Sequence, residues 1–147
     1  MKSAQSLYTL TIEIISGLLI ILFLYTGLSK VLDFKGFKGE MYNQVFPHLT
    51  ATFIIFTLPF VEILIAGALL FVKTRMGGFY ASLILMLLFT IYTTSVLLHF
   101  FNRIPCSCGG VIKKLSWNQH LVLNLFFVTI SIAGLILLKK NKSANNT

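Results

Sequence analysis

The sequence predicts an all-α fold, an integral membrane four-helix bundle, from its composition and from the spacing of its apolar segments. Of the 147 residues, 56% are hydrophobic and 11% are charged, and the mean hydropathy is +0.88. About a quarter of the residues of a soluble domain are charged, so this chain has too few polar side chains to cover a globule in water. Four apolar segments each come close to the roughly 20 residues that cross the hydrocarbon core as a helix.

The chain is expected to form a single domain over residues 1–147, with membrane spans at about 9–30, 50–72, 79–101 and 118–138. Backbone groups in lipid must find hydrogen bonds within the protein, so each span is expected to be a helix. The first apolar run is too long for the core of a signal peptide, and no small-residue cleavage pattern follows it. We therefore expect the first run to remain as a membrane span.

The connections between the spans differ in character. The segment after the first span, DFKGFKGEMYNQVFPHL, is amphipathic and aromatic, so it can hold a short interfacial helix. A tight basic turn, KTRMGG, joins the second and third spans, and NRIPCSCGGVIKKLSW joins the third and fourth. The basic tail, KKNKSANNT, is expected to be frayed.

The positive charges do not decide the orientation. With both termini inside, six Lys and Arg residues lie on each side: Lys2, Lys73, Arg75, Lys139, Lys140 and Lys142 inside, and Lys30, Lys35, Lys38, Arg103, Lys113 and Lys114 outside. The inner segments contain no acidic residue, and disulfides persist outside the cytosol. We therefore expect a multi-pass protein of the bacterial inner membrane, with cytoplasmic termini and the cysteine loop outside. Short basic clusters between apolar runs are typical of loops at lipid headgroups, so no nucleic-acid partner is expected.

The third connection holds both cysteines of the chain, Cys106 and Cys108, in the stretch RIPCSCGGV. A bond between them would close almost no loop, so it would stabilise the fold little. A disulfide across one intervening residue is also strained, and strain makes the bond easier to exchange. Nearby Arg103, Lys113 and Lys114 favour the nucleophilic thiolate. The stretch therefore favours a redox-active pair, and a structural or inert pair is the alternative.

A metal site is the second alternative for these thiols. Together with His99 and His120, the two cysteines form a nominal Cys2His2 set. The spacing matches no common zinc motif, and one intervening residue is tight for two thiolates on one ion. We therefore expect no bound metal.

The fourth span begins with SWNQHLVLN, in which Ser116 can cap the helix. Trp117, His120 and Asn124 follow at i, i+3 and i+7, on one helical face. An amide inside hydrocarbon needs a partner, and a histidine there can carry a proton or bond a quinone carbonyl. These residues are expected to line a cavity below the cysteine loop, or, alternatively, to make helix-packing contacts.

Glu62 lies well inside the second span, where a charged side chain costs at least ~3 kcal/mol and normally faces the bundle interior with a partner. Lys30, near the end of the first span, is its best candidate partner. Two interpretations stay open, an ion pair that locks two helices and a site that holds a proton.

Three motifs carry a resemblance to the MauE/DoxX group of small membrane redox-associated proteins. TGLSKVLDF is similar to the group's Gly-x-x-Lys signature, PFVEILIAGALL to its Glu-then-Gly pattern, and CSCGG to the Cys-x-Cys-Phe-Gly element of the methylamine-utilisation MauE branch. Gly109 stands where that branch often has an aromatic residue. The resemblance implies a four-helix bundle that works beside thioredoxin-like proteins, and the wider group adds quinone-coupled oxidation.

We therefore expect a membrane thiol–disulfide oxidoreductase that exchanges with an extracytoplasmic thioredoxin-like partner and has a quinone as its candidate acceptor. Cys106, Cys108 and His120 are the expected catalytic residues. Trp117, Asn124, Glu62 and Lys30 are the expected cofactor-binding residues. The alternatives are a non-catalytic membrane subunit or maturation factor that holds such a partner, and a small metal-handling or transport protein.

Overall fold

The computed structural model describes the backbone over residues 2–100 and 116–145. This part of the chain forms helices only: α1 (Lys2–Leu32), α2 (Phe34–Tyr42), α3 (His48–Leu70), α4 (Arg75–Leu97) and α5 (Trp117–Asn145). Four of them are long and apolar enough to cross a membrane, over Ser6–Leu32, His48–Leu70, Arg75–Leu97 and Trp117–Ser143. The predicted all-α membrane bundle is confirmed.

The helix bounds differ from the predicted spans mainly at the ends. α1 begins near the N-terminus and continues two residues past Lys30, whereas α4 begins at Arg75 and ends at Leu97. The expectation of a frayed tail was wrong, because α5 continues as helix to Asn145. Polar residues can extend a helix beyond the hydrocarbon, so hydropathy gives the length of a span and not the length of its helix.

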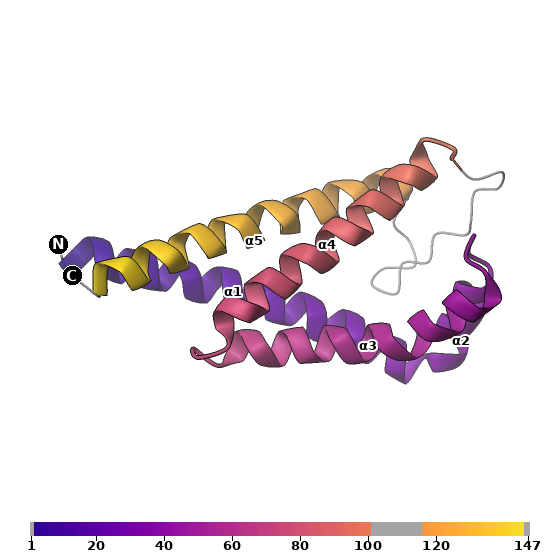
Figure 1. Cartoon of the computed structure of the whole chain (residues 1–147), viewed down its shortest axis with the longest axis horizontal. Coiled ribbons are helices and arrows are strands. Elements are labelled where there is room, and N and C mark those ends of the chain that lie inside the picture. Colours follow the sequence, from indigo (N-terminus) through magenta and orange to yellow (C-terminus); the bar gives the residue numbers. More distant parts are fainter. Residues whose placement is uncertain (1, 101–115, 146–147) are drawn as a thin grey trace.

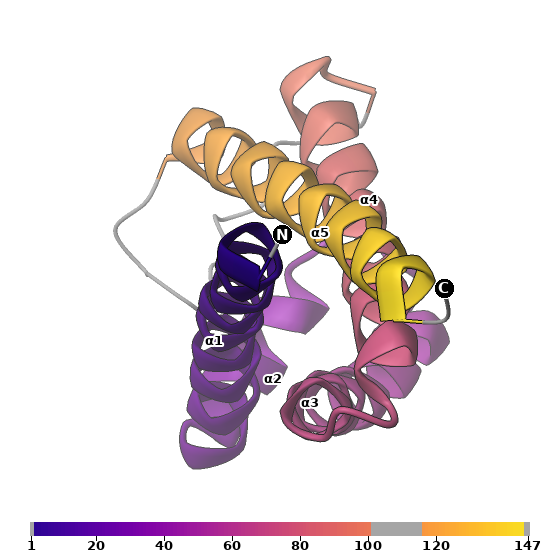
Figure 2. The same ribbon diagram turned by 90° about the vertical axis from the view of Figure 1, so that its left-hand side faces the viewer.

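The four long helices pack as a ring of neighbours, in which α1 contacts α3 and α5, and α4 contacts α3 and α5. The main core joins all four, with Leu19 and Phe23 of α1, Leu69 of α3, Phe79 of α4 and Leu135 of α5 among its buried members. The start of α1 and the end of α5 lie at the same end of the molecule (Figures 1 and 2).

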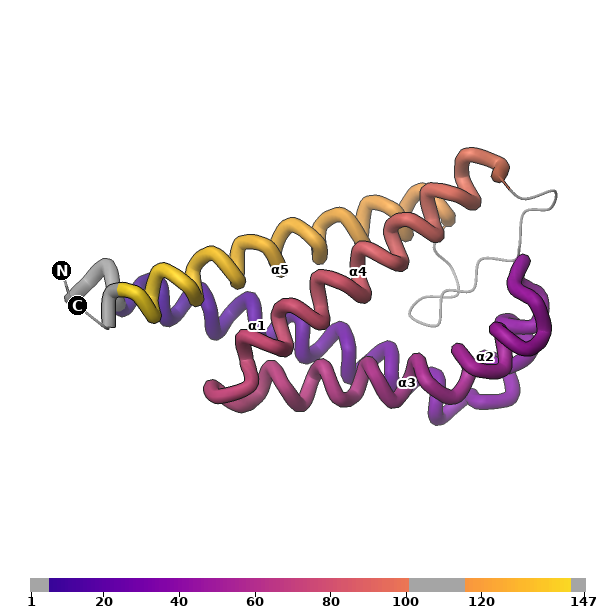
Figure 3. The backbone as a smooth tube through the Cα atoms, viewed as in Figure 1, coloured from indigo at the N-terminus to yellow at the C-terminus, as the bar shows by residue number. Residues whose placement is uncertain are grey.

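α4 leaves α3 at the turn 71–74 and diverges from it toward the opposite end of the molecule (Figure 3). The turn is tied to α1 by Arg75, whose guanidinium nitrogens donate to the Glu13 carboxylate at 2.6 and 3.3 Å. Arg75 also donates from Nε to the carbonyl of Leu69 at 3.2 Å. The sequence analysis missed this ion pair. It closes the bundle at the end that holds the termini.

α2 lies at the end away from the termini (Figure 1) and confirms the short helix predicted for the first connection. Asp33 caps it by accepting from the Gly36 amide at 3.2 Å, and Phe37 and Met41 pack on Ile55 of α3. α2 therefore packs across the end of the bundle opposite the termini.

α4 ends at the same end of the molecule as α2, in a Schellman motif. His99 has a φ of 56°, its amide donates to Val96, and the Phe100 amide donates to Ser95. Histidine is one of the non-glycine residues that tolerate this left-handed conformation. The motif fixes the point from which the cysteine segment departs.

Candidate functional site

A cavity of about 350 Å³ lies at the α2 end of the bundle, and all five helices contribute to its walls. Its volume is within the range of small-molecule sites, which are mostly apolar with a few placed polar groups. The lining consists of Leu22, Thr26, Lys30, Phe37, Met41, Gln44, Phe46, Ile54, Leu58, Glu62, Leu85, Met86, Leu88, Phe89, Tyr92, Thr93, Trp117, His120, Leu123, Asn124 and Phe127.

The wall made by α1 and α3 holds the ion pair that the sequence predicted. Nζ of Lys30 lies 2.8 and 2.9 Å from the two carboxylate oxygens of Glu62, and the side chains are 7% and 1% exposed. Gly27 lets the helices approach here, since a Cβ at Gly27 would lie 3.0 Å from Ile63 and 3.3 Å from the Pro59 carbonyl oxygen. One turn after this close approach, Lys30 reaches Glu62.

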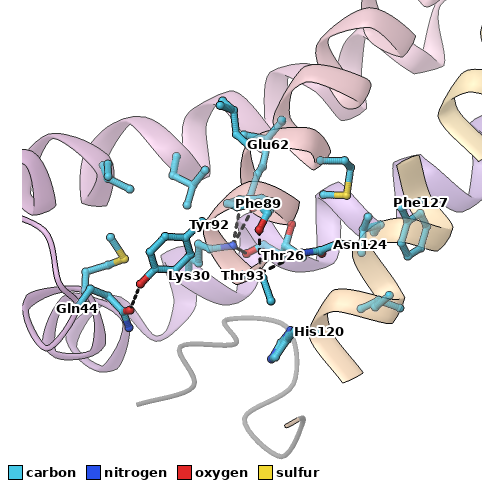
Figure 4. Close-up of a pocket in the computed structure, with 18 of the residues that line it drawn as sticks. Thr26, Lys30, Gln44, Glu62, Phe89, Tyr92, Thr93, His120, Asn124 and Phe127 are labelled. Carbon is cyan, nitrogen blue, oxygen red and sulfur yellow. Dashed lines mark hydrogen bonds and ion pairs between the residues drawn. The ribbon is translucent and has the colours of Figure 1, made fainter. Parts of the chain in front are cut away.

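All three N–H donors of the Lys30 ammonium group have acceptors within the protein. Its third donor bond goes to the carbonyl of Thr26 at 3.2 Å, so the three protons of the ammonium have three acceptors. A buried charge that keeps all its bonds inside the protein has none free for a ligand. The pair is a closed, neutral unit in the cavity wall (Figure 4).

The wall made by α5 is set by its first turn, where Ser116 and Gln119 form a capping box. The Gln119 side-chain oxygen accepts from the Ser116 amide at 2.9 Å, and Ser116 Oγ accepts from the Gln119 amide at 3.4 Å. This capping box fixes the residue at which α5 begins. The predicted cap is confirmed.

Trp117, His120 and Asn124 all line the cavity, as expected for one helical face. Asn124 donates from Nδ2 to Thr93 Oγ1 of α4 at 3.3 Å. Nε2 of His120 is buried and has no hydrogen-bond partner among the residues that the structure describes. His120 therefore differs from Asn124, because its buried Nε2 has no partner within residues 2–100 and 116–145 (Figure 4).

Three aromatic side chains in contact, Phe46, Tyr92 and Trp117, lie at the end of the cavity nearest α2. The Tyr92 ring stacks on Phe46 with centroids 5.1 Å apart and meets Trp117 edge-on at 6.3 Å. The Tyr92 hydroxyl donates to Gln44 Oε1, which joins α4 to the segment between α2 and α3. Gln44 is almost fully buried, at 2% exposure.

The sequence analysis missed Thr26, Gln44, Tyr92 and Thr93 as lining residues. Tyr92 and Thr93 lie in TIYTTS, a polar cluster inside an apolar span, and that cluster was a usable signal. Gln44 carried none, because it sits in a polar connection where an amide is ordinary. Its burial depends on the tertiary position of α4.

A protein-family model matches most of the chain. The model of the family described as methylamine utilisation protein MauE matches residues 8–137. The chain belongs to the MauE family. Searches of the curated proteins and of the solved structures found no match to it. The DoxX part of the predicted resemblance stays a prediction.

In this MauE-family chain, Cys106 and Cys108 lie outside the described residues. The end of α4 and the start of α5, which precede and follow that segment, lie at the end of the bundle where α2 is found (Figure 1). Tyr92 and Trp117, near those two ends, both line the cavity. The segment that carries the cysteines therefore joins two helices that both line the cavity.

The metal alternative used His99 and His120 together with the same cysteines. His99 occupies the left-handed position that ends α4, and His120 lines the cavity. Within residues 2–100 and 116–145, no three His, Cys, Asp or Glu side chains gather as metal ligands would.

Proposed function

We propose that this chain is a membrane redox protein of methylamine utilisation, which exchanges thiol and disulfide equivalents with an extracytoplasmic thioredoxin-like protein. The observation that carries the proposal is the cavity lined by the two helices that the cysteine-bearing segment joins. That segment connects α4 to α5, and those two helices place Tyr92, Trp117 and His120 around the cavity. The family description supports the process and leaves the chemistry open.

The exchange follows the ordinary route through a mixed disulfide. A thiolate of the partner attacks one sulfur of a Cys106–Cys108 disulfide, and the other cysteine leaves as a thiolate that takes up a proton. The second partner thiolate then attacks the mixed disulfide. The partner becomes a disulfide, and Cys106 and Cys108 become thiols, having gained two electrons and two protons.

A quinone is the proposed acceptor that resets the pair. The two thiols become a disulfide and lose two electrons and two protons, which convert the quinone to a quinol. The cavity lined by α4 and α5, the two helices that the cysteine segment joins, supports this step. Nε2 of His120, which has no partner in the described part of the chain, can carry a proton there, while Trp117, Asn124, Lys30 and Glu62 form the surrounding walls.

Trapping of mixed disulfides tests the proposal. Cys108→Ser, expressed in membranes under oxidising conditions, is expected to accumulate a partner adduct on Cys106. The Cys106 thiolate can attack the disulfide of an oxidised partner, and Cys108, which would release that partner by forming the Cys106–Cys108 disulfide, is missing. The adduct should appear as a reducible shift on a gel, and its second component should be a thioredoxin-like protein. Cys106→Ser/Cys108→Ser is the matched control and should show no shift.

Two results would overturn this reading. The first is a pair that stays reduced under oxidising conditions, and the second is a double variant that supports methylamine utilisation as well as the parent chain. Either result would favour the alternative, a non-catalytic subunit that holds an extracytoplasmic partner.

A further inference from the structure

Among the lining residues that the structure describes, the only charged side chains are Lys30 and Glu62, and their charges cancel each other. Lys30 donates to both oxygens of Glu62 and to the Thr26 carbonyl. A ligand anion would have to displace Glu62 from Lys30, and a ligand cation would have to displace Lys30 from Glu62. Each exchange leaves one buried charge without its partner, which is strongly unfavourable.

In the described lining, the polar group left without a partner is a hydrogen-bonding one and carries no net charge. Nε2 of His120 lacks a partner among the described residues, and a neutral imidazole nitrogen can donate or accept according to its tautomer. Most of the remaining wall is apolar, with large side chains such as Leu22, Phe89 and Phe127. A ligand with one polar end and an apolar body fits this distribution.

One lining residue of the cavity also has a large exposed surface. Leu88 of α4 lines the cavity and is 58% exposed, on a helix long and apolar enough to cross a membrane. The proposed ligand is therefore expected to enter from the bilayer, past this side chain.

We propose that the cavity binds an uncharged, bilayer-soluble molecule through its carbonyl or hydroxyl head at His120 Nε2, and that the Lys30–Glu62 pair excludes charged heads. This inference rests on the proposed function only in that a quinone belongs to this ligand class. Binding itself needs no thiol chemistry. Lys30 and Glu62 thus act as specificity determinants rather than as direct ligands.

The chain contains one tryptophan, and Trp117 lines the cavity, so its fluorescence reports on a quencher bound there. The probes are three brominated twelve-carbon chains that differ in the head: an alcohol, a carboxylate and a quaternary ammonium. Each is titrated into the purified Cys106→Ser/Cys108→Ser chain in neutral detergent. The alcohol should quench saturably, and the two ions should bind about tenfold more weakly or worse.

Replacing one residue of the Lys30–Glu62 pair should raise the affinity for the probe whose charge is opposite to the residue that remains. Glu62→Gln leaves the ammonium of Lys30 unpaired, so the carboxylate probe should gain about tenfold in affinity. Lys30→Met leaves the carboxylate of Glu62, so the ammonium probe should gain instead. Lys30→Met/Glu62→Gln restores neutrality and should again prefer the alcohol.

Two controls repeat the changes of net charge outside the cavity. Glu13→Gln matches Glu62→Gln at the far end of the bundle, and Lys35→Met matches Lys30→Met on exposed α2. Neither should alter the order of the probes. His120→Phe, which keeps a ring but removes the nitrogen, should weaken the alcohol about tenfold.

Equal quenching by all three heads in the parent chain would overturn the proposal, and this comparison needs no pair variant to fold. The proposal would also fail if the two control variants gained as much as the cavity variants. Selective quenching together with no partner adduct on Cys106 would sink the proposed function and leave this inference standing. The reverse combination would sink this inference alone.

Discussion

At the scale of single residues, the Lys30–Glu62 pair shows how far the sequence could go. A carboxylate deep in an apolar span demands a partner, and Lys30 was the nearest cation on a helix end, so the contact was predictable. The closed hydrogen bonding of Lys30 was not, because it depends on the Thr26 carbonyl one turn away.

Removing one member of this pair should destabilise the fold more than removing both. Glu62→Gln strands a buried ammonium, and we expect a loss of about 3 kcal/mol in the free energy of unfolding. Adding Lys30→Met should recover part of that loss. Unfolding of the four chains of the double-mutant cycle in detergent measures the coupling, and additive effects would show that the two side chains do not interact.

His120 is the residue on which electron exit should depend. His120→Phe should slow reoxidation of the Cys106–Cys108 thiols by quinone about tenfold or more, because a proton carrier contributes at least that much. It should leave the partner adduct of the Cys108→Ser chain intact. Gel-shift trapping with and without added quinone gives both readings. Asn118→Ala, an exposed neighbour on α5, is the control, and an equal slowing there would remove the specific role of His120.

At the scale of helices, the four spans followed from hydropathy and the face of α5 from its period. Trp117, His120 and Asn124 were placed on one face without a structure, because their spacing fixes it once the segment is helical. The partner of Asn124 was not predictable. Thr93 is one of several hydroxyl residues on α4, and only the packing of α4 on α5 selects it.

Gly27 sets the distance between α1 and α3 and should tolerate no larger side chain. Gly27→Leu is expected to lower the free energy of unfolding by about 1–3 kcal/mol, because the new side chain would meet Ile63 and the Pro59 carbonyl. Gly17→Leu is the matched control on the same helix, where a Cβ has no neighbour within 4 Å. Leucine has the higher helix propensity, so propensity opposes a loss at either position. Equal losses at both positions would mean that the close approach of α1 to α3 is not the cause.

At the scale of the whole molecule, the connections between the helices lie at two opposite ends of the bundle. The sequence predicted this division only from the order of the spans. The turn 71–74 lies toward the end of the bundle where α1 begins and α5 ends, while α2, the end of α4 and the start of α5 lie at the other (Figure 1). An even number of spans made this division predictable. The cavity was harder to predict, since it forms where α4 diverges from α3.

The side of the membrane that each end faces stays a prediction. With cytoplasmic termini, a thiol reagent that cannot cross the membrane should label reduced Cys106 and Cys108 in intact cells. The Cys106→Ser/Cys108→Ser chain should stay unlabelled, as a measure of background. Labelling that appears only after the membrane is broken would reverse the orientation.

The closed Lys30–Glu62 pair also has an electrical consequence. A single charge that moves across the full membrane potential changes its energy by about 2.3 kcal/mol per 100 mV, but a neutral pair contributes only a small dipole. Loading an uncharged molecule beside it moves no net charge through the field. Occupancy of the cavity should therefore be independent of the potential of an energised membrane. Glu62→Gln, which leaves one positive charge buried in the bundle, should make occupancy by a charged head respond to that potential.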